Sequence, residues 1–338
     1  MAPTVIHFDP PRVPTTGDAA ALQQGAARKI TYLRVSVTDR CNLRCRYCMP
    51  SDQDFLRPDS LLSYEQIVAV ARPLVARGVN KIRITGGEPL LRRSLHTLVS
   101  MLKALPGSPE VVMTTNALLL GRHAAALKDA GLDRLNVSLD TLRPERFERL
   151  ARRPGLEQAL KGLDAASAAG FTNTKLNAVV MGGFNDDEIP DLLTFSAERG
   201  LQLRFIEFMP MASNGYGLDA ERVPLAEILA RIAAVGELVP LERGSGPAST
   251  YRLASTGQEL GLIAAISMPF CDSCNRLRLT SDGILRSCLF EGGEVSVRAL
   301  LADPDPDARL GEALDVLRRV KPLVHDGQGH VHMNRVGG

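Results

Sequence analysis

Residues 31–50 of the chain, TYLRVSVTDRCNLRCRYCMP, place a β-branched run directly before three closely spaced cysteines. These are Cys41, Cys45 and Cys48, in the spacing Cys-x3-Cys-x2-Cys. Three thiolates so close together can bind three irons of a four-iron cube, which usually has four cysteine ligands. The spacing therefore predicts a cluster whose fourth iron stays open to a small molecule, as a catalytic zinc site keeps one position for water or substrate. A zinc knuckle is the alternative that the spacing alone leaves open.

The other three of the six cysteines form a second group in the segment PFCDSCNRLRLTSDGILRSCLF, residues 269–290. Cys271, Cys274 and Cys288 follow the spacing Cys-x2-Cys-x13-Cys, again without a nearby fourth cysteine. Disulfides are not expected, because a chain of 338 residues in a reducing compartment does not need them. The clustering favours metal binding over ordinary buried thiols. The alternative to an iron cluster here is a zinc site completed by one of three histidines: His325, His330 or His332.

Composition excludes several broad classes of function. A formal net charge of +2 is too small an excess of positive charge to indicate general binding to nucleic acid or to a membrane surface. No apolar run reaches the roughly 18 residues that span a bilayer. Residues 1–18 lack the charged start and apolar centre of a signal peptide. The sequence therefore predicts a soluble, cytoplasmic protein without nucleic-acid or membrane partners.

Short β-branched runs alternate with helical patterns along the first two thirds of the chain. Predicted strands cover residues 31–37, 81–85, 110–115, 134–139, 174–180 and 203–208. Predicted helices cover residues 63–78, 121–131 and 156–170, and the first has Ser63 as its N-cap with Gln66 three positions later. Six strands that alternate with helices predict an α/β fold with an incomplete (β/α)6 barrel of the TIM type.

The pattern changes near residue 215, where an amphipathic helix (224–235), a Gly-rich stretch and short strands precede the second cysteine group. We expect three parts: a flexible N-terminal extension over 1–29, the partial barrel over 30–245, and a smaller C-terminal domain over 246–338. The C-terminal domain is predicted to be α+β, to carry the second cluster, and to cover the open side of the barrel.

Polar side chains alternate with apolar ones along several predicted strands, so they share one face of each strand. Lys81, Arg83 and Thr85, for example, alternate with Ile82 and Ile84. The same pattern gives the polar positions Arg34, Ser36, Lys175, Asn177, Arg276 and Arg278. These side chains either face the barrel interior or lie outward with their stems along flanking helices.

The cysteine loop, Tyr47 before its last cysteine, and Gly-Gly-Glu-Pro at 86–89 together resemble the radical S-adenosylmethionine (SAM) superfamily. The resemblance implies that the first loop holds a [4Fe-4S] cluster whose open iron is chelated by SAM. Reductive cleavage of SAM then yields a 5′-deoxyadenosyl radical. In such enzymes the cofactors carry the chemistry, while the protein positions and shields them.

A closer resemblance, from about residue 32 to residue 338, is to the GTP 3′,8-cyclase family of molybdenum cofactor biosynthesis. It rests on KIRITGGEPLLRR, NVSLD, RFIEFMPM, the CxxCNRxR pattern with a third cysteine downstream, and a terminal Gly-Gly. It implies conversion of GTP to (8S)-3′,8-cyclo-7,8-dihydroguanosine 5′-triphosphate, with hydrogen abstracted from the ribose C3′. It also implies a second [4Fe-4S] cluster, on the second cysteine group, whose open iron meets the guanine.

The resemblance assigns residues to three sets beyond the six cysteine ligands. The predicted SAM contacts are Tyr47, Gly87, Ser138 and Met209. The predicted GTP contacts are Arg34, Arg83, Thr114, Lys175, Arg276, Leu277 and Arg278, of which Leu277 would contribute main chain. Gly337 and Gly338 would form a catalytic tail inserted into the active site. Because the basic positions of the strands coincide with these contacts, the inward, anion-binding orientation is favoured.

The resemblance also implies a homodimer, an electron donor, and a downstream cyclic pyranopterin monophosphate synthase that receives the product. Two departures from the family pattern stand out. Ala117 follows Thr-Thr-Asn where the family commonly has glycine, so a positive φ at this position would be strained. Arg335 and Val336 stand in the tail where smaller or isoleucine-like residues are expected. Two other functions remain open: a radical enzyme that modifies a peptide, and a zinc- or iron-sulfur-binding sensor or electron carrier.

Overall fold

The computed structural model describes residues 28–209, 211, 221–242, 244, 246–290, 293–325 and 332–337. Most of the predicted N-terminal extension, residues 1–27, lies outside the described residues. The described strands form one 12-stranded sheet with the order β12-β11-β10-β1-β2-β3-β4-β5-β6-β9-β8-β7.

Six parallel strands in chain order form the centre of this sheet. They are β1 (Tyr32–Ser36), β2 (Lys81–Thr85), β3 (Glu110–Thr115), β4 (Arg134–Ser138), β5 (Lys175–Val180) and β6 (Gln202–Glu207). β1 pairs with β10 and β6 pairs with β9, so the six strands do not close on one another. The predicted α/β fold with an incomplete barrel is confirmed.

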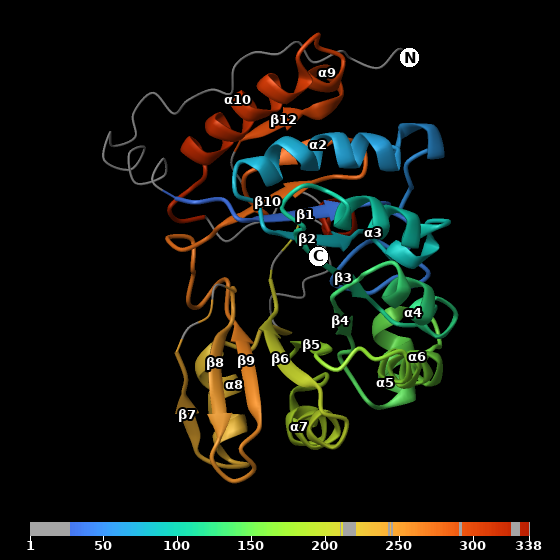
Figure 1. Ribbon diagram of the computed structural model, residues 1–338. Coiled ribbons are helices and arrows are strands. Elements are labelled where there is room, and N and C mark those ends of the chain that lie inside the picture. Colours follow the sequence, from blue (N-terminus) through green and yellow to red (C-terminus); the bar gives the residue numbers. More distant parts are fainter. Residues whose placement is uncertain are drawn as a thin grey trace.

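Helices connect these strands and lie on the outer side of the curved sheet (Figure 1). They are α2 (Tyr64–Ala76), α3 (Leu95–Lys103), α4 (Leu120–Asp129), α5 (Pro144–Ala151), α6 (Leu156–Ala168) and α7 (Ile189–Glu198). Short 3-10 turns η1 (Pro58–Ser60), η2 (Pro89–Leu91) and η3 (Asp186–Glu188) accompany them. None of the described helices combines the length and apolar character that a bilayer crossing requires.

The start of α2 shows how the sequence sets a helix boundary. The Ser63 hydroxyl accepts a hydrogen bond from the Gln66 amide (3.2 Å), and the Gln66 side chain accepts one from the Ser63 amide (2.9 Å). This is the predicted capping box, and it satisfies two backbone donors that a helix N-terminus leaves free. After the helix, Gly78 has a φ of +103°, a conformation that glycine adopts without strain.

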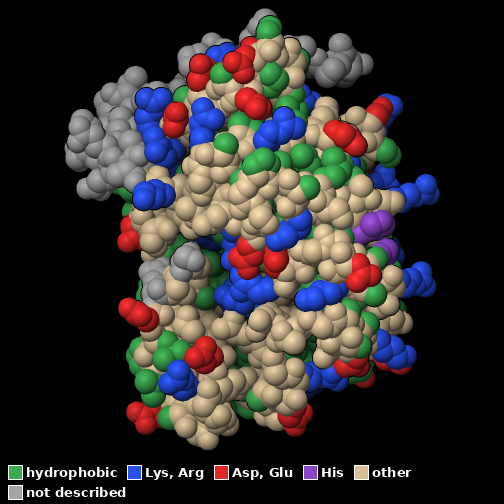
Figure 2. Space-filling model, in the orientation of Figure 1, with side chains coloured by type: hydrophobic (Ala, Val, Ile, Leu, Met, Phe, Trp, Pro, Cys, Tyr) green, Lys and Arg blue, Asp and Glu red, His purple; other side chains and the backbone are tan. Residues whose placement is uncertain are grey.

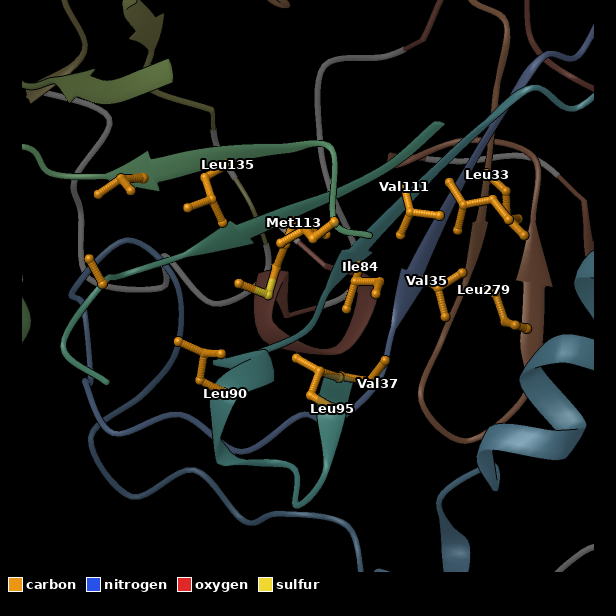
Figure 3. Packing of buried hydrophobic residues seen from close by; sticks show 14 of the residues in the cluster. Leu33, Val35, Val37, Ile84, Leu90, Leu95, Val111, Met113, Leu135 and Leu279 are labelled. Atoms are coloured by element: carbon orange, nitrogen blue, oxygen red, sulfur yellow. The ribbon is translucent and has the colours of Figure 1, made fainter. Parts of the chain in front are cut away.

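The core lies between the sheet and the helices. Leu33, Val35, Ile84, Val111 and Met113 come from three neighbouring strands and pack together in Figure 3. These residues alternate along their strands with the polar positions identified in the sequence. Because side chains alternate between the two faces of a strand, burying this apolar set against the helices turns the polar set inward.

The C-terminal half extends the sheet at both edges. On the β1 edge lie β10 (Arg276–Leu279), β11 (Ile284–Arg286) and β12 (Glu294–Ser296); on the β6 edge lie β9 (Glu259–Ile263), β8 (Ser249–Leu253) and β7 (Leu238–Pro240). The accompanying helices are α8 (Leu225–Ala233), α9 (Val297–Leu301), α10 (Pro306–Arg319) and α11 (Met333–Val336). The segment expected to be an appended domain therefore continues the barrel sheet, as Figure 1 shows. The division at residue 245 remains a prediction; it falls between β7 and β8, which pair with each other.

Candidate active site

A cavity of about 860 Å³ lies on the inner face of the sheet. All six cysteines line it, together with side chains from β1 to β6, β9 and β10. Lys81, Arg83 and Thr85 of β2 face the cavity, whereas Ile82 and Ile84 belong to the core. The predicted inward orientation of the polar strand positions is confirmed for Arg34, Lys175, Asn177, Arg276 and Arg278 as well.

The first cysteine group lies on the loop that follows β1, at the carboxyl end of the barrel strands. Two main-chain hydrogen bonds join this loop to the end of α5, from Arg44 to Ala151 (2.9 Å) and from Arg46 to Leu150 (3.0 Å). A third, from Cys48 to Cys45 (2.9 Å), folds the loop into a turn. The backbone thus holds the three thiols on one side of the cavity without any bond between them.

The electrostatics of this group suit a cationic metal cluster. Burial raises the pKa of Cys41 to about 11 and raises those of Cys45 and Cys48. The neighbouring cysteines add to the rise, since each thiolate would repel the others. Three thiolates in this position need compensating positive charge, which iron ions supply. The donor set therefore fits the [4Fe-4S] cluster that the sequence predicted.

Tyr47 connects the cysteine loop to the end of β4. Its hydroxyl donates a hydrogen bond to Asp140 Oδ2 (2.8 Å), and the other carboxylate oxygen accepts one from the Val179 amide (2.8 Å). Burial raises the pKa of Asp140 to about 6 and raises that of Tyr47. Tyr47 and Ser138 both line the cavity with the cysteines, and their contact with SAM stays a prediction. Asp140 is the last residue of the NVSLD motif and was not among the predicted site residues.

The Gly-Gly-Glu-Pro segment brings β2 close to the cysteine loop. The Gly87 amide donates to the Thr38 carbonyl (2.7 Å), and a Cβ at Gly87 would overlap the Arg40 carbonyl. Only glycine allows this approach. The buried Glu88 accepts hydrogen bonds from the Thr115 hydroxyl (2.8 Å) and the Asn116 amide (2.8 Å), which ties the end of β3 to the same segment. Gly87 and Met209 also line the cavity.

Ala117 has the strained conformation that the sequence raised as a possibility. Its φ is +65°, and the residue is fully buried. The left-handed conformation costs a residue with a Cβ roughly 1–2 kcal/mol. Gly162 of α6 lies against it, and a Cβ at Gly162 would overlap the Ala117 carbonyl. The helix therefore packs directly on the strained loop.

The second cysteine group lies at the opposite end of the strands. Cys271 and Cys274 precede β10, which runs parallel to β1, and Cys288 follows the antiparallel β11. These three cysteines thus lie at the amino end of the barrel strands, while the first group lies at the carboxyl end. Both groups line the same cavity, so they face each other across it.

Basic groups surround the second cysteine group. Burial opposes ionisation of Cys274, yet Arg276 and Lys321 lower its pKa to about 6, and Arg276 Nη2 lies 3.4 Å from its sulfur. Arg28 donates to the Cys271 carbonyl at 2.7 Å, a contact from the end of the predicted extension that the sequence did not reveal. A thiolate is thus stabilised here, which is the form that binds metal.

The histidine alternative for this site is only partly supported. His325 lines the cavity and stacks on Phe290 with ring centroids 4.1 Å apart, whereas His332 is not among the lining residues. His330 lies outside the described residues. Within the described ranges, no three histidine, cysteine, aspartate or glutamate side chains lie as close together as one metal ion requires. A four-iron cube sets its thiolates further apart than a single ion does.

The wall between the two cysteine groups is cationic. Burial and the neighbouring Arg204 lower the pKa of Lys175 to about 7, and burial lowers those of Arg34 and Arg204 to about 10. Such shifts mean that the surroundings of these cations offset only part of the cost of their burial, so a polyanion would be stabilised among them. Sequence reasoning missed Arg134, Arg204 and Lys321, although Arg204 alternates with apolar residues in the predicted strand 203–208.

One carboxylate, Glu110, interrupts the cationic wall. It pairs with Lys81 at 2.8 Å and accepts a hydrogen bond from Arg134 Nε at 2.6 Å. The three residues lie on β2, β3 and β4, side by side in the sheet. Figure 2 shows Lys and Arg side chains meeting acidic side chains near the middle of the displayed face.

Two predicted GTP contacts have structural partners of their own. Thr114 Oγ1 accepts a hydrogen bond from Arg83 Nη1 at 3.0 Å, so it orients that guanidinium. Leu277 is fully buried in the core opposite Leu33, so only its main chain is available to a ligand. Arg34, Arg83, Lys175, Arg276 and Arg278 face the cavity.

The chain's C-terminal tail docks on the same basic residues. The Gly337 carbonyl accepts hydrogen bonds from Arg34 Nη2 (3.1 Å) and Arg278 Nη1 (2.7 Å). Gly337 has a φ of +73°, and a Cβ there would overlap the Thr85 methyl. Asn334 donates to the Asp39 carbonyl (3.0 Å), which anchors α11 beside the first cysteine loop. Gly338 lies outside the described residues.

Two family profiles match consecutive parts of the chain: the Radical SAM superfamily over residues 35–196 and Molybdenum Cofactor Synthesis C over residues 201–326. A GTP 3′,8-cyclase from Geobacter sulfurreducens is 46% identical over 301 residues, which cover 88% of this chain and 92% of the relative. One from Moorella thermoacetica is 43% identical over 307 residues, covering 90% and 95%. The solved structure of Streptococcus suis SuiB bound to precursor peptide SuiA has a TM-score of 0.53 at 19% identity, over 64% of this chain and 48% of that one, which shows a shared fold.

Proposed function

The chain belongs to the GTP 3′,8-cyclase family of the radical SAM superfamily, and we propose from this that GTP is its substrate. The reaction converts GTP to (8S)-3′,8-cyclo-7,8-dihydroguanosine 5′-triphosphate, the first step of molybdenum cofactor biosynthesis. The observation that carries the proposal is the pair of three-cysteine groups at opposite ends of one cation-walled cavity.

The first cysteine loop holds a [4Fe-4S] cluster and SAM, as the superfamily implies. When bound and reductively cleaved, SAM supplies the 5′-deoxyadenosyl radical that abstracts hydrogen from the substrate. Tyr47, Gly87, Ser138 and Met209 line this end of the cavity and would contact SAM. The Tyr47–Asp140 hydrogen bond ties the loop to the end of β4.

The second group, Cys271, Cys274 and Cys288, would hold a second [4Fe-4S] cluster and bind the guanine of GTP. Support comes from the incomplete ligand set and from the cations that stabilise the Cys274 thiolate. A cluster held by these three thiolates would have one iron without a protein ligand, and a purine nitrogen or oxygen would be its fourth ligand.

The basic residues between the clusters would bind the triphosphate. Arg34, Arg83, Lys175, Arg276 and Arg278 supply charge-assisted hydrogen bonds, and Thr114 orients Arg83. The Leu277 main chain lies between two of these arginines. Gly337 and Gly338 would complete the wall, since the Gly337 carbonyl already lies against Arg34 and Arg278.

Several further features of the function are proposals that follow from the family. A homodimer, an external electron donor and a downstream cyclic pyranopterin monophosphate synthase are expected partners. The free state of all six cysteines suits a reducing, cytoplasmic compartment. The division into an extension (1–29), a barrel (30–245) and a C-terminal domain (246–338) also stays a proposal.

A nucleotide panel tests the proposed substrate. The holoenzyme, reconstituted anaerobically, is given SAM and a reductant with GTP, ATP, guanosine or no nucleotide. We expect GTP to stimulate release of 5′-deoxyadenosine and to disappear in proportion to it. Release that is the same with and without GTP would reject the proposal.

A further inference from the structure

Tyr32 lies inside the cavity at a position that the proposed function does not use. It is the first residue of β1, its side chain is 8% exposed, and it lines the cavity. Its neighbours in the sheet are Lys81 on β2 and Arg276 on β10. Tyr32 therefore lies between the cationic wall and the second cysteine group.

The Arg83 guanidinium donates a hydrogen bond through Nε to the Tyr32 hydroxyl oxygen. The positive charge of Arg34, two positions along the same strand, also acts on this hydroxyl. The Arg83 guanidinium and the Lys81 ammonium also lie 5.8 Å and 5.7 Å from the centre of the tyrosine ring. The phenol oxygen is thus held among cations that have been proposed to bind the nucleotide.

The donor and acceptor capacities of these groups determine what the hydroxyl can do next. A phenol has two acceptor sites and one hydrogen to donate, whereas a guanidinium has only donors. Arg83 therefore uses acceptor capacity of Tyr32, and neither Arg83 nor Arg34 can receive its hydrogen. The hydrogen is available to an acceptor in the cavity, and among these cations the acceptor best stabilised is an anionic oxygen.

We propose that the Tyr32 hydroxyl donates a hydrogen bond to a phosphate oxygen of the bound nucleotide. The inference rests on the proposed function, and it makes Tyr32 a nucleotide-binding residue that also fixes Arg34 and Arg83. The phosphate would thus be bound by the neutral Tyr32 hydroxyl as well as by the neighbouring cations Arg34 and Arg83.

The charges that face Tyr32 make this contact sensitive to pH. Burial opposes ionisation, but Arg83 and Arg34 on the same wall, with Lys81, lower the pKa of Tyr32 to about 8. Arg204 on β6 also interacts electrostatically with Tyr32, and Arg276 is the neighbour of Tyr32 on β10. Below pH 8 the neutral hydroxyl donates its hydrogen; above it, the phenolate has no hydrogen and repels phosphate.

Tyr32→Phe removes the hydroxyl and keeps the ring. In the reconstituted holoenzyme without reductant, we expect the Kd for GTP to rise roughly tenfold or more, as for a hydrogen bond to a charged group. The Kd for guanosine, which has no phosphate, should stay within about twofold. Tyr64→Phe is the matched control, because its hydroxyl donates to the Arg93 carbonyl outside the cavity (2.7 Å); it should leave both constants unchanged.

A pH series separates hydrogen donation to phosphate from mere positioning of the arginines. It uses Lys175→Arg protein, in which the titration of Lys175 is removed. Affinity for GTP should fall as the pH rises through about 8, and Tyr32→Phe in the same background should abolish this fall. If the hydroxyl lay away from the phosphate and only positioned Arg34 and Arg83, its ionisation would not place negative charge against the phosphate, and no fall would occur.

Either of two results overturns the inference: Tyr32→Phe that weakens guanosine as much as GTP, or a pH profile that the substitution does not change. Both measurements require that the Tyr32→Phe protein is folded. Unchanged iron content and an unchanged thermal unfolding temperature of the holoenzyme would establish this. Failure of the proposed function looks different, because wild-type protein itself would then neither bind nor consume GTP.

Discussion

The Gly337 carbonyl accepts a hydrogen bond from Arg278 at 2.7 Å, so the tail of the chain lies against an arginine that follows the second cysteine group. The arginine is fixed by β10 and the glycine by α11, two elements that are distant in sequence. Arg278, a proposed substrate contact, and the tail therefore form one continuous wall.

Gly337→Ala should disrupt this wall. A Cβ at Gly337 would overlap the Thr85 methyl, and φ of +73° is unfavourable for alanine, so the tail must move away from Arg34 and Arg278. We expect turnover of GTP to fall at least about tenfold, the equivalent of about 1.4 kcal/mol, while iron content is retained. Gly257→Ala is the control, because Gly257 has a similar φ (+71°) and nothing within 4 Å of its Cβ position. Equal losses in the two variants would show that strain alone, and not the tail contact, is responsible.

Ala117→Gly should relieve backbone strain. Relief of the left-handed conformation, about 1–2 kcal/mol, offsets the greater entropy of glycine and the loss of a buried methyl group, which cost about 0.5–1 and 0.8 kcal/mol. The free energy of unfolding should therefore stay within about 1 kcal/mol of wild type. Ala124→Gly, at a buried position inside α4, has no such compensation and should cost more. Chemical denaturation of both variants compares them; an Ala117→Gly that is the less stable of the two would argue against strain at Ala117.

The two cysteine groups should load iron independently. Reconstituted wild-type protein is expected to hold about eight irons per chain, from two cubes. Cys45→Ala and Cys274→Ala should each lower this to about four, the first with loss of SAM cleavage and the second with loss of GTP binding. Iron analysis measures the loss of iron in each variant, and 5′-deoxyadenosine release measures SAM cleavage. Titration with GTP measures the loss of binding. A protein that takes up zinc in place of iron at either group would contradict the assignment of that group.

Lys175 should make GTP binding sensitive to pH near neutrality. Burial and Arg204 lower its pKa to about 7, so it is charged below this pH and neutral above it. Bound phosphate favours the charged form, so affinity for GTP should fall as the pH rises through about 7. Arginine stays charged throughout, so Lys175→Arg should flatten this part of the profile. Calorimetric titrations with GTP at several pH values measure this difference. If affinity fell with pH equally in wild type and Lys175→Arg, Lys175 would be excluded as the source of the pH dependence.

Glu110→Gln should lower the free energy of unfolding of the protein without GTP. It should also increase the stabilisation that added GTP provides. Without the carboxylate, Lys81 and Arg134 lose their shared partner, at a cost of about 1 kcal/mol for these partly exposed pairs. The same cations then become free to bind phosphate, so the rise in Tm on adding GTP should exceed that of wild type. Glu227→Gln breaks an exposed pair with Arg231 on α8 and serves as the control. An unchanged effect of GTP in Glu110→Gln would place the triphosphate away from this pair.

Periodicity in the sequence was enough to predict the central barrel, because each of its strands obeys a local rule. Lys81, Arg83 and Thr85 alternate with Ile82 and Ile84, and the apolar members pack against helices, so the polar members face inward. The capping box at Ser63 is equally local and was predicted to the residue.

Features that depend on distant contacts were not predictable in this way. Nothing near Arg276 in the sequence indicates that β10 pairs with β1, yet this pairing places the second cysteine group opposite the first. Arg28, Lys321 and Tyr32 enter the site through such long-range contacts. For Leu277 the family resemblance implied a main-chain contribution only, and its side chain lies in the core. The strain at Ala117 was foreseen because the residue type itself conflicts with the conformation.

Transfer of deuterium from the substrate tests the central claim most directly. The anaerobic holoenzyme is given SAM, a reductant and GTP that carries deuterium at the ribose C3′, and the released 5′-deoxyadenosine is examined by mass spectrometry. The account predicts 5′-deoxyadenosine that contains one deuterium, together with a cyclised guanosine triphosphate. Unlabelled 5′-deoxyadenosine, formed at the same rate whether or not GTP is present, would contradict it.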